Sequence, residues 1–76
     1  MGLWEALREC RREQAEEQGV PPYVIFHDST LIEMCSMLPK TRDEFANLTG
    51  VGERKLLKYG DAFLTAIRRA QDEAAM

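Results

Sequence analysis

Apolar residues recur every three or four positions near the start of the chain. This spacing places them along one side of an α-helix. The residues of this stripe are Leu3, Ala6, Leu7 and Cys10. Gly19 suits the position just after a helix end, and Pro21 cannot continue a helix. The pattern therefore predicts a helix over residues 3–18.

Residues 20–27 follow a different pattern. The run Tyr23-Val24-Ile25-Phe26 has the composition of a β-strand, yet the chain offers no second run that could pair with it. An unpaired strand would leave its backbone groups without hydrogen bonds. We therefore expect an ordered connector whose Val24, Ile25 and Phe26 fill the core.

Four further helices are predicted in the rest of the chain. Asp28 is placed to cap a helix over residues 29–37, and Thr41 with Glu44 matches a capping box before a helix over residues 42–47. A tight turn at residues 49–52 leads to a helix over residues 53–59, which Gly60 should end, and to a last helix over residues 61–73. The inward positions are expected to be Leu31, Met34, Cys35, Leu38, Phe45, Leu48, Leu56, Leu57, Phe63, Ile67, Ala70 and Ala74. The prediction is an all-α fold, a small five-helix bundle that forms one domain over residues 1–76.

Composition and charge narrow the class of protein. With 76 residues, 45% of them hydrophobic and 30% charged, the chain is expected to be a single small globular domain. No apolar run is long enough to cross a membrane, and the first residues lack the pattern of a signal peptide. Two cysteines are too few for a disulfide scaffold, so we expect reduced thiols in an intracellular protein.

Catalytic and metal chemistry find little support in the residue pattern. His27 is the only histidine, and its only carboxylate partner by spacing is its neighbour Asp28. The spacing of Cys10, His27 and Cys35 matches no zinc pattern. We expect no enzyme activity, no metal and no cofactor, with the cysteines filling the core and His27 on the surface near a helix start.

The glycine turn Thr49-Gly50-Val51-Gly52 is the first candidate binding feature. A helix, a turn with two glycines and a second helix resemble a helix-hairpin-helix, whose free backbone amides can bind a phosphate. Arg54, Lys55 and Lys58 follow directly and could add charge to the same site. The alternative is that the glycines only make a tight corner between two helices, followed by three solvated basic residues.

The distribution of charge favours the carboxyl-terminal half for this role. The net charge of the chain is −3, so any binding of nucleic acid needs a local patch. Residues 1–39 contain three basic and seven acidic residues, a net of −4, whereas residues 40–76 contain seven and six, a net of +1. With so few cations, binding should be weak and strongly dependent on salt.

Tyr23 is the second candidate binding feature. It follows Pro21 and Pro22, which stiffen the backbone before it. An exposed tyrosine ring at this place would be a platform on which a nucleobase can stack. The alternative is that the ring packs on the first helix and only its hydroxyl reaches the surface.

Two segments resemble one known family. Residues 20–34, VPPYVIFHDSTLIEM, resemble the V-P-P-Y-x-[VI]-F-x-D-x-T-L-x-x-M segment of HRDC domains, named after helicase and RNase D C-terminal regions. Residues 48–56, LTGVGERKL, and the pair Tyr59-Gly60 resemble the G-V-G-x-x-K-[LV] turn and the Y-G pair of the same family. The intact Pro-Pro-Tyr run is more similar to the branch found in bacterial RecQ helicases than to that of RNase D-type exonucleases.

The resemblance implies both a fold and a function. It implies a five-helix, non-catalytic module of a longer RecQ-type helicase in the bacterial cytoplasm, associated with the nucleoid and acting as a monomer with no membrane contact. Such a module binds single-stranded or branched DNA. The tyrosine that faces DNA in the family falls on Tyr23 here, and the basic companions fall on Arg54, Lys55 and Lys58 near Gly50 and Gly52.

A second function remains open at this stage. The predicted first helix is acidic, with Glu5, Glu9, Glu13 and Glu16 at helical spacing. This surface could dock on a basic surface of the parent helicase core or of another protein. The domain would then be a protein-interaction module and not a DNA-binding one.

Overall fold

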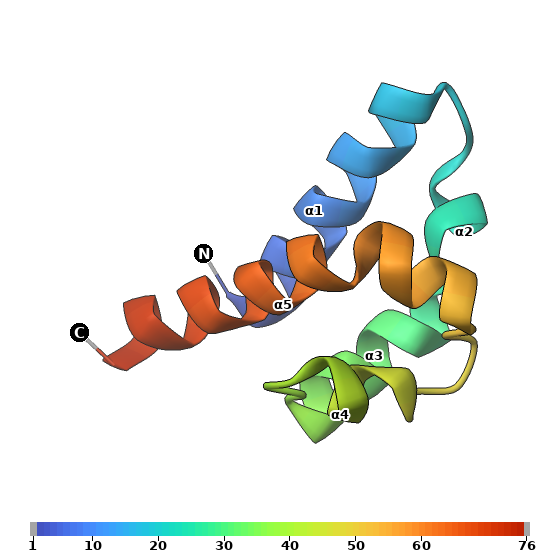
Figure 1. Cartoon of the computed structure of the whole chain (residues 1–76). Helices are drawn as coiled ribbons and strands as arrows, with labels where there is room; N and C mark the ends of the chain where they lie inside the picture. The colour runs from blue at the N-terminus through green and yellow to red at the C-terminus, as the bar shows by residue number, and fades with distance from the viewer. Residues whose placement is uncertain (1, 76) are drawn as a thin grey trace.

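The computed structural model describes residues 2–75, and all regular structure in this range is helical. The five helices are α1 (Leu3–Gln18), α2 (Pro22–Ile25), α3 (Asp28–Met37), α4 (Arg42–Ala46) and α5 (Glu53–Ala75). In Figure 1, α5 crosses the middle of the molecule, with α1 above it and with α3 and α4 below it. The predicted all-α, five-helix fold is confirmed, although two of the helices differ from the prediction.

The predicted break at Gly60 is wrong. Helix α5 runs unbroken over 23 residues through this glycine. Gly60 is buried, and a Cβ atom there would lie 3.0 Å from Leu56 Cδ1, so the glycine serves close packing within the helix. A glycine inside a helix costs about 1 kcal/mol relative to alanine. The buried side chains of Tyr59, Phe63 and Ile67 on the same face of α5 offset this cost.

The connector between α1 and α3 contains one short helix that the residue pattern did not predict. Pro22 occupies the first turn of α2, where a missing backbone N–H does no harm. Ile25 and Phe26 are buried as expected, whereas Val24 is 42% exposed. The cap of α3 also differs, because His27 is the N-cap residue and Asp28 lies inside the first turn.

Helix α5 has a narrower buried face than predicted. Leu57 is 67% exposed and Ala74 is exposed, although both were expected to point inward. The continuous helix sets one rotational phase from Tyr59 to Ile67, and Leu57 lies outside the stripe that this phase defines. The expected inward positions Leu31, Met34, Phe45 and Leu48 are buried.

Phe26 lies at the centre of the core. Its ring centroid lies 5.0 Å from that of Phe63, 5.9 Å from that of Tyr59 and 6.0 Å from that of Phe45, in edge-to-face arrangements. These are favourable geometries for aromatic pairs. The connector is therefore fixed to both α4 and α5 through one side chain.

Arg11 fixes the same connector to α1. Although charged, this residue is only 8% exposed. Its Nη1 donates to the carbonyl oxygen of Phe26 at 3.1 Å and pairs with Asp28 Oδ1 at 2.7 Å. A buried charge needs such partners. Arg11 stands between the buried Leu7 and Ala15 on α1, so it belongs to the inward face of that helix.

The turn before α5 is anchored to α3. The Thr30 hydroxyl donates to the Thr49 carbonyl at 3.0 Å, and the Thr49 amide donates to the Glu33 carboxylate at 3.1 Å. Gly50 has a φ of +85°, a conformation that favours glycine. On the other side of α4, the predicted capping box of Thr41 and Glu44 is present.

Replacement of Arg11 tests its role in holding the connector. Arg11→Met leaves the buried Phe26 carbonyl without its donor, so we expect a loss of about 2 kcal/mol in the free energy of unfolding. Arg12→Met is the matched control, because Arg12 is exposed and its ion pairs contribute less than about 1 kcal/mol. Urea denaturation followed by circular dichroism measures both. Equal losses in the two variants would contradict the assignment.

The two glycines of the turn should respond differently to substitution. A Cβ atom at position 50 would lie 2.9 Å from Thr30 Oγ1 and would have to adopt the positive φ. We expect Gly50→Ala to cost about 2 kcal/mol or more of unfolding free energy. At Gly52 a Cβ atom meets nothing within 4 Å, so Gly52→Ala should cost less than about 1 kcal/mol. Thermal unfolding of both variants checks this order, and a larger loss at position 52 would refute it.

Candidate nucleic-acid interface

Tyr23 is exposed on α2. Its relative exposure is 60%, so the alternative in which the ring packs on α1 is excluded. Pro21 is the N-cap of α2 and Pro22 is its first residue, so the backbone at Tyr23 is preceded by two fixed φ angles. The tyrosine side chain is therefore accessible from solvent, as base stacking requires.

The ring of Tyr23 has an aromatic neighbour that sequence reasoning did not select. The centroids of Tyr23 and His27 lie 6.3 Å apart, and the two ring planes differ by 23°. A shallow hollow lies beside the pair. It is lined by Arg11, Pro22, Tyr23, His27, Asp28 and Ser29. The spacing of Tyr23 and His27 gave no signal for this proximity, because α2 ends at Ile25 and both Phe26 and His27 are extended, whereas side chains four residues apart meet within a continuous helix.

The three predicted basic residues lie in the first two turns of α5. Arg54 and Lys58 are exposed, while Lys55 is half-buried with its Nζ 5.5 Å from the centroid of the Phe26 ring. Lys58 Nζ donates to Gln18 Oε1 at 3.1 Å and lies 5.5 Å from the centroid of Tyr59. Within residues 2–75, these three cations form no ion pair with a carboxylate. Their charge is therefore available to an external anion.

The turn before these cations also offers backbone donors. Gly50 and Gly52 are exposed, and the Gly52 carbonyl accepts the Leu56 N–H at 2.9 Å, so Gly52 is the residue directly before α5 whose carbonyl accepts the first hydrogen bond of the helix. The first amides of a helix have no intrahelical acceptor and carry the positive end of its dipole. Glycine has no side chain that could cap these amides itself.

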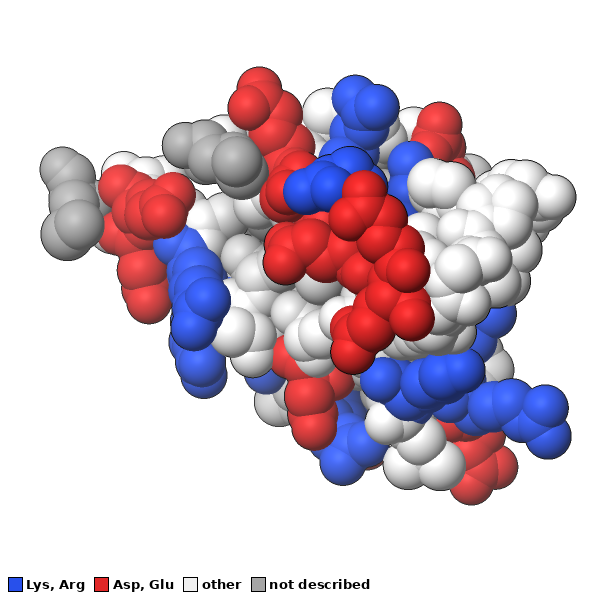
Figure 2. All heavy atoms as spheres, turned by 90° about the horizontal axis from the view of Figure 1, so that it is seen from above, with Lys and Arg blue, Asp and Glu red and all other residues white. Residues whose placement is uncertain are grey.

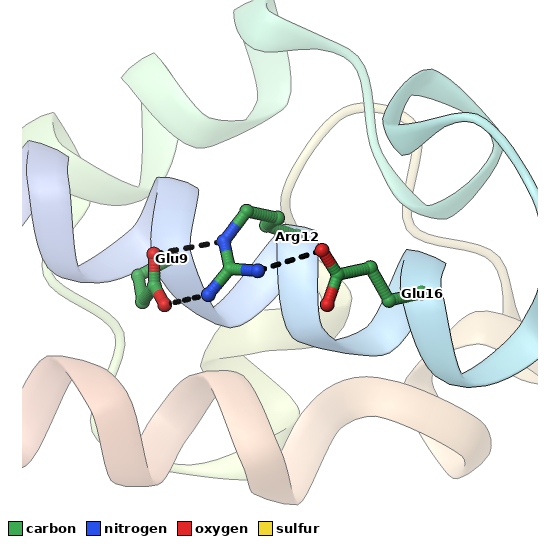
Figure 3. Close-up of polar contacts among 3 residues, drawn as sticks. All are labelled: Glu9, Arg12 and Glu16. Carbon is green, nitrogen blue, oxygen red and sulfur yellow. Dashed lines mark hydrogen bonds and ion pairs between the residues drawn. The ribbon is translucent and has the colours of Figure 1, made fainter.

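Basic residues elsewhere on the surface form ion pairs with acidic residues. Figure 3 shows Arg12 between Glu9 and Glu16 on α1, and it forms hydrogen-bonded ion pairs with both. The distance from Arg12 Nη1 to Glu16 Oε1 is 2.7 Å. Hydrogen bonding to Arg12 lowers the pKa of Glu9, and the two carboxylates raise the pKa of Arg12. Arg42 pairs with Asp61 at 3.7 Å. Basic residues held in this way contribute little to the attraction of a polyanion.

The charged side chains divide the surface into regions. Figure 2, which looks onto the face above α1, shows acidic side chains gathered across its middle and basic side chains on either side. Helix α1 carries the five acidic residues Glu5, Glu9, Glu13, Glu16 and Glu17. A DNA backbone would be repelled from this band, so an interface has to lie beyond it.

Tyr23 and the basic residues of α5 do not contact each other directly, but both groups are connected to Phe26. The backbone of Phe26 is held by Arg11, which lines the hollow beside Tyr23, and the ring of Phe26 lies under Lys55. In the described range, Tyr23 forms no ring contact or hydrogen bond with Arg54, Lys55 or Lys58. The predicted residues therefore form two neighbouring groups that share one anchoring residue.

The cysteines and the potential metal ligands lie apart from one another in residues 2–75. No group of three potential metal-ligating side chains occurs in this range, and Cys10 and Cys35 are both free thiols. Burial, with a smaller effect of Glu13, raises the pKa of Cys10 to about 11, and burial also raises the pKa of Cys35. A thiol with a raised pKa is a poor nucleophile at neutral pH.

Within residues 2–75, no helix has the combination of length and apolar character that crossing a bilayer requires.

Comparison with known proteins identifies the relatives of the chain. Residues 1–67 match the family model of the HRDC domain. The ATP-dependent DNA helicase RecQ of Bacillus subtilis is 52% identical over 66 residues, which are 87% of this chain and 11% of that protein. The ATP-dependent DNA helicase UvrD2 of Mycobacterium tuberculosis is 40% identical over 62 residues, which are 82% of this chain and 9% of that protein.

A solved structure agrees with these relatives. D. radiodurans RecQ HRDC domain 3 superposes with a TM-score of 0.89 at 40% identity, over 92% of each chain. The chain spans about a tenth of the length of the helicases it matches. The arrangement of helices and the similarity in sequence lead to the same conclusion: the chain belongs to the HRDC domain family, and it is a non-catalytic accessory domain of the kind found in RecQ-type helicases.

Proposed function

We propose that this domain binds single-stranded or branched DNA, weakly and without catalysis, as an accessory module of a RecQ-type helicase. The observation that carries the proposal is the exposed ring of Tyr23 on a backbone fixed by two prolines. Stacking on an aromatic ring accepts any base, so it suits a module that follows a strand of any sequence. In this proposal residues 1–76 act as one monomeric domain of a longer bacterial protein that works at the nucleoid in the cytoplasm.

The basic residues of α5 supply the second half of the proposed interface. Arg54, Lys55 and Lys58 hold phosphates, with help from the backbone amides around Gly50 to Glu53, of which, within residues 2–75, only that of Val51 already donates to a carbonyl, that of Leu48. Support comes from the lack of any ion pair to these cations within residues 2–75. Three such contacts on a chain of net charge −3 give weak binding that falls steeply with salt.

Docking of a partner protein through the acidic face of α1 is less well supported. Two of its carboxylates, Glu9 and Glu16, are already paired with Arg12 on the same helix. Their interaction with a basic partner would have to compete with this internal pairing. The DNA-binding function needs no such exchange, and it is the one we propose.

Replacement of Tyr23 tests the stacking contact. Tyr23→Ala should lower the affinity for a labelled oligo-dT strand by about fivefold or more, because loss of a stacking ring costs about 1–3 kcal/mol per base. The slope of log affinity against log salt should stay the same, since no charge is removed. Fluorescence anisotropy at low and near-physiological salt measures both quantities. Val24→Ala, which trims the neighbouring exposed side chain on α2, is the control and should bind like the wild type.

Replacement of Lys55 tests the phosphate contact. Lys55→Ala should lower the affinity and also reduce the salt slope by about 0.7, the value for one phosphate contact on a single strand. Lys40→Ala removes the same charge from the segment between α3 and α4 and should leave the slope unchanged. Circular dichroism melts must accompany the titrations because Lys55 also covers the Phe26 ring. If the wild type fails to bind the strand even at low salt, the proposed function is wrong.

A further inference from the structure

His27 is an exposed aromatic residue whose side chain has no structural task in its helix. It is the N-cap of α3, yet its side chain makes no capping hydrogen bond. The backbone carbonyl of His27 does the work at this helix start, accepting the Thr30 amide at 3.0 Å and the Leu31 amide at 3.3 Å. The imidazole ring instead lies beside the ring of Tyr23.

The backbone that carries these two rings is fixed by the residues between them. Ile25 and Phe26 are 0% and 1% exposed, and the Phe26 carbonyl is bound by the buried Arg11. Tyr23 stands before this buried pair and His27 directly after it, so burial of the pair holds both rings at the surface. A backbone that is already ordered loses little conformational freedom when a ligand binds.

We propose that Tyr23 and His27 form one two-ring platform that binds two adjacent unpaired bases of a DNA strand. This proposal rests on the proposed function and adds a second contact residue to it. The imidazole, like the phenol, is among the side-chain rings on which unstacked bases are bound. With ring planes 23° apart and centroids 6.3 Å apart, the two rings offer nearly parallel faces to neighbouring bases.

The separation of the rings also predicts the state of the DNA that fits. Bases in a duplex follow one another at about 3.4 Å and cover each other's faces. A centroid separation of 6.3 Å suits bases that are splayed apart, which only an unpaired strand allows. His27 should therefore contribute to the binding of single strands and not to that of duplex DNA.

The charges around the platform do not oppose this use. The one carboxylate in the hollow is that of Asp28, and it is paired with Arg11 Nη1 at 2.7 Å. Apart from this ion pair and the two rings, the hollow is lined by Pro22 and Ser29, and the hydroxyl of Ser29 can donate to a base edge or to a phosphate. The hollow beside the two rings can thus accept a nucleotide without placing it against an unpaired negative charge.

The test compares variants of the 76-residue chain in anisotropy titrations with labelled oligo-dT. His27→Ala should lower the affinity by about fivefold or more with no change in salt slope, since one stacking ring is lost. His27→Phe should restore the affinity, because a stacking role needs the ring and not its nitrogens. Met37→Ala is the matched control: it trims an exposed apolar side chain at the opposite end of α3 and should bind like the wild type.

Titration with a second DNA strand distinguishes a platform of two rings from a single stacking ring. An oligo-dT in which every second base is missing keeps all phosphates but offers no two adjacent bases. On this strand the wild type and His27→Ala should bind equally, and on duplex DNA they should also bind equally. Circular dichroism melts of the variants exclude unfolding as the cause of any loss.

The outcomes distinguish this inference from the function on which it rests. If Tyr23→Ala weakens binding while His27→Ala does not, or if His27→Phe fails to restore it, the platform is refuted and the proposed function stands. If the wild type does not bind oligo-dT at low salt, both are refuted. Loss in His27→Ala, recovery in His27→Phe and equality on the alternating strand support the platform.

Discussion

The burial of Phe26 determines where both halves of the proposed interface lie. Its ring packs edge-to-face against Phe45, Tyr59 and Phe63, so the connector after α1 is drawn into the centre of the bundle. Its carbonyl would then be a buried acceptor without a partner if Arg11 did not reach it from α1. One backbone conformation allows the ring of Phe26 to pack in the core and its carbonyl to accept the hydrogen bond from Arg11. That conformation leaves Tyr23 and His27 outside the core and brings Lys55 over the ring.

Much of the fold could be predicted because local rules and tertiary packing agree in most of the chain. The apolar stripe at the start of α1 and the capping box at Thr41 predicted two helices, and their bounds in the structure agree with the prediction to within one residue. The errors arose where tertiary burial overrides a local preference. Gly60 is a weak helix former, but its lack of a side chain allows close packing of Leu56, and α5 continues. The strand-like run before Phe26 became a one-turn helix because the buried pair, and not β-propensity, sets its conformation.

The residue types of the proposed interface could be predicted from the sequence. Which of the basic side chains form ion pairs could not. Tyr23 and the basic residues of α5 could be selected from motif and charge, yet net charge does not tell which cations are free. Arg12 stands between Glu9 and Glu16 at spacings that favour pairing, and it is paired. The contribution of Arg11 was hidden because an arginine within an apolar stripe is ordinarily a surface residue at its edge. Its buried hydrogen bonds depend on the path of the connector, which no local pattern encodes.

An acidic domain that binds a polyanion weakly is physically consistent with a role inside a larger helicase. Free in solution, three unpaired cations and one or two stacking rings give little affinity at physiological salt. Joined to a helicase that already holds the DNA, the same surface would meet the strand at an effective concentration of order millimolar. Weak contacts then suffice to favour one DNA structure over another, while a tighter module would slow the release that movement along DNA requires. The acidic band over α1 fits this proposed use, because it would repel DNA from one face and would leave the proposed interface at Tyr23 and Lys55 as the place to bind.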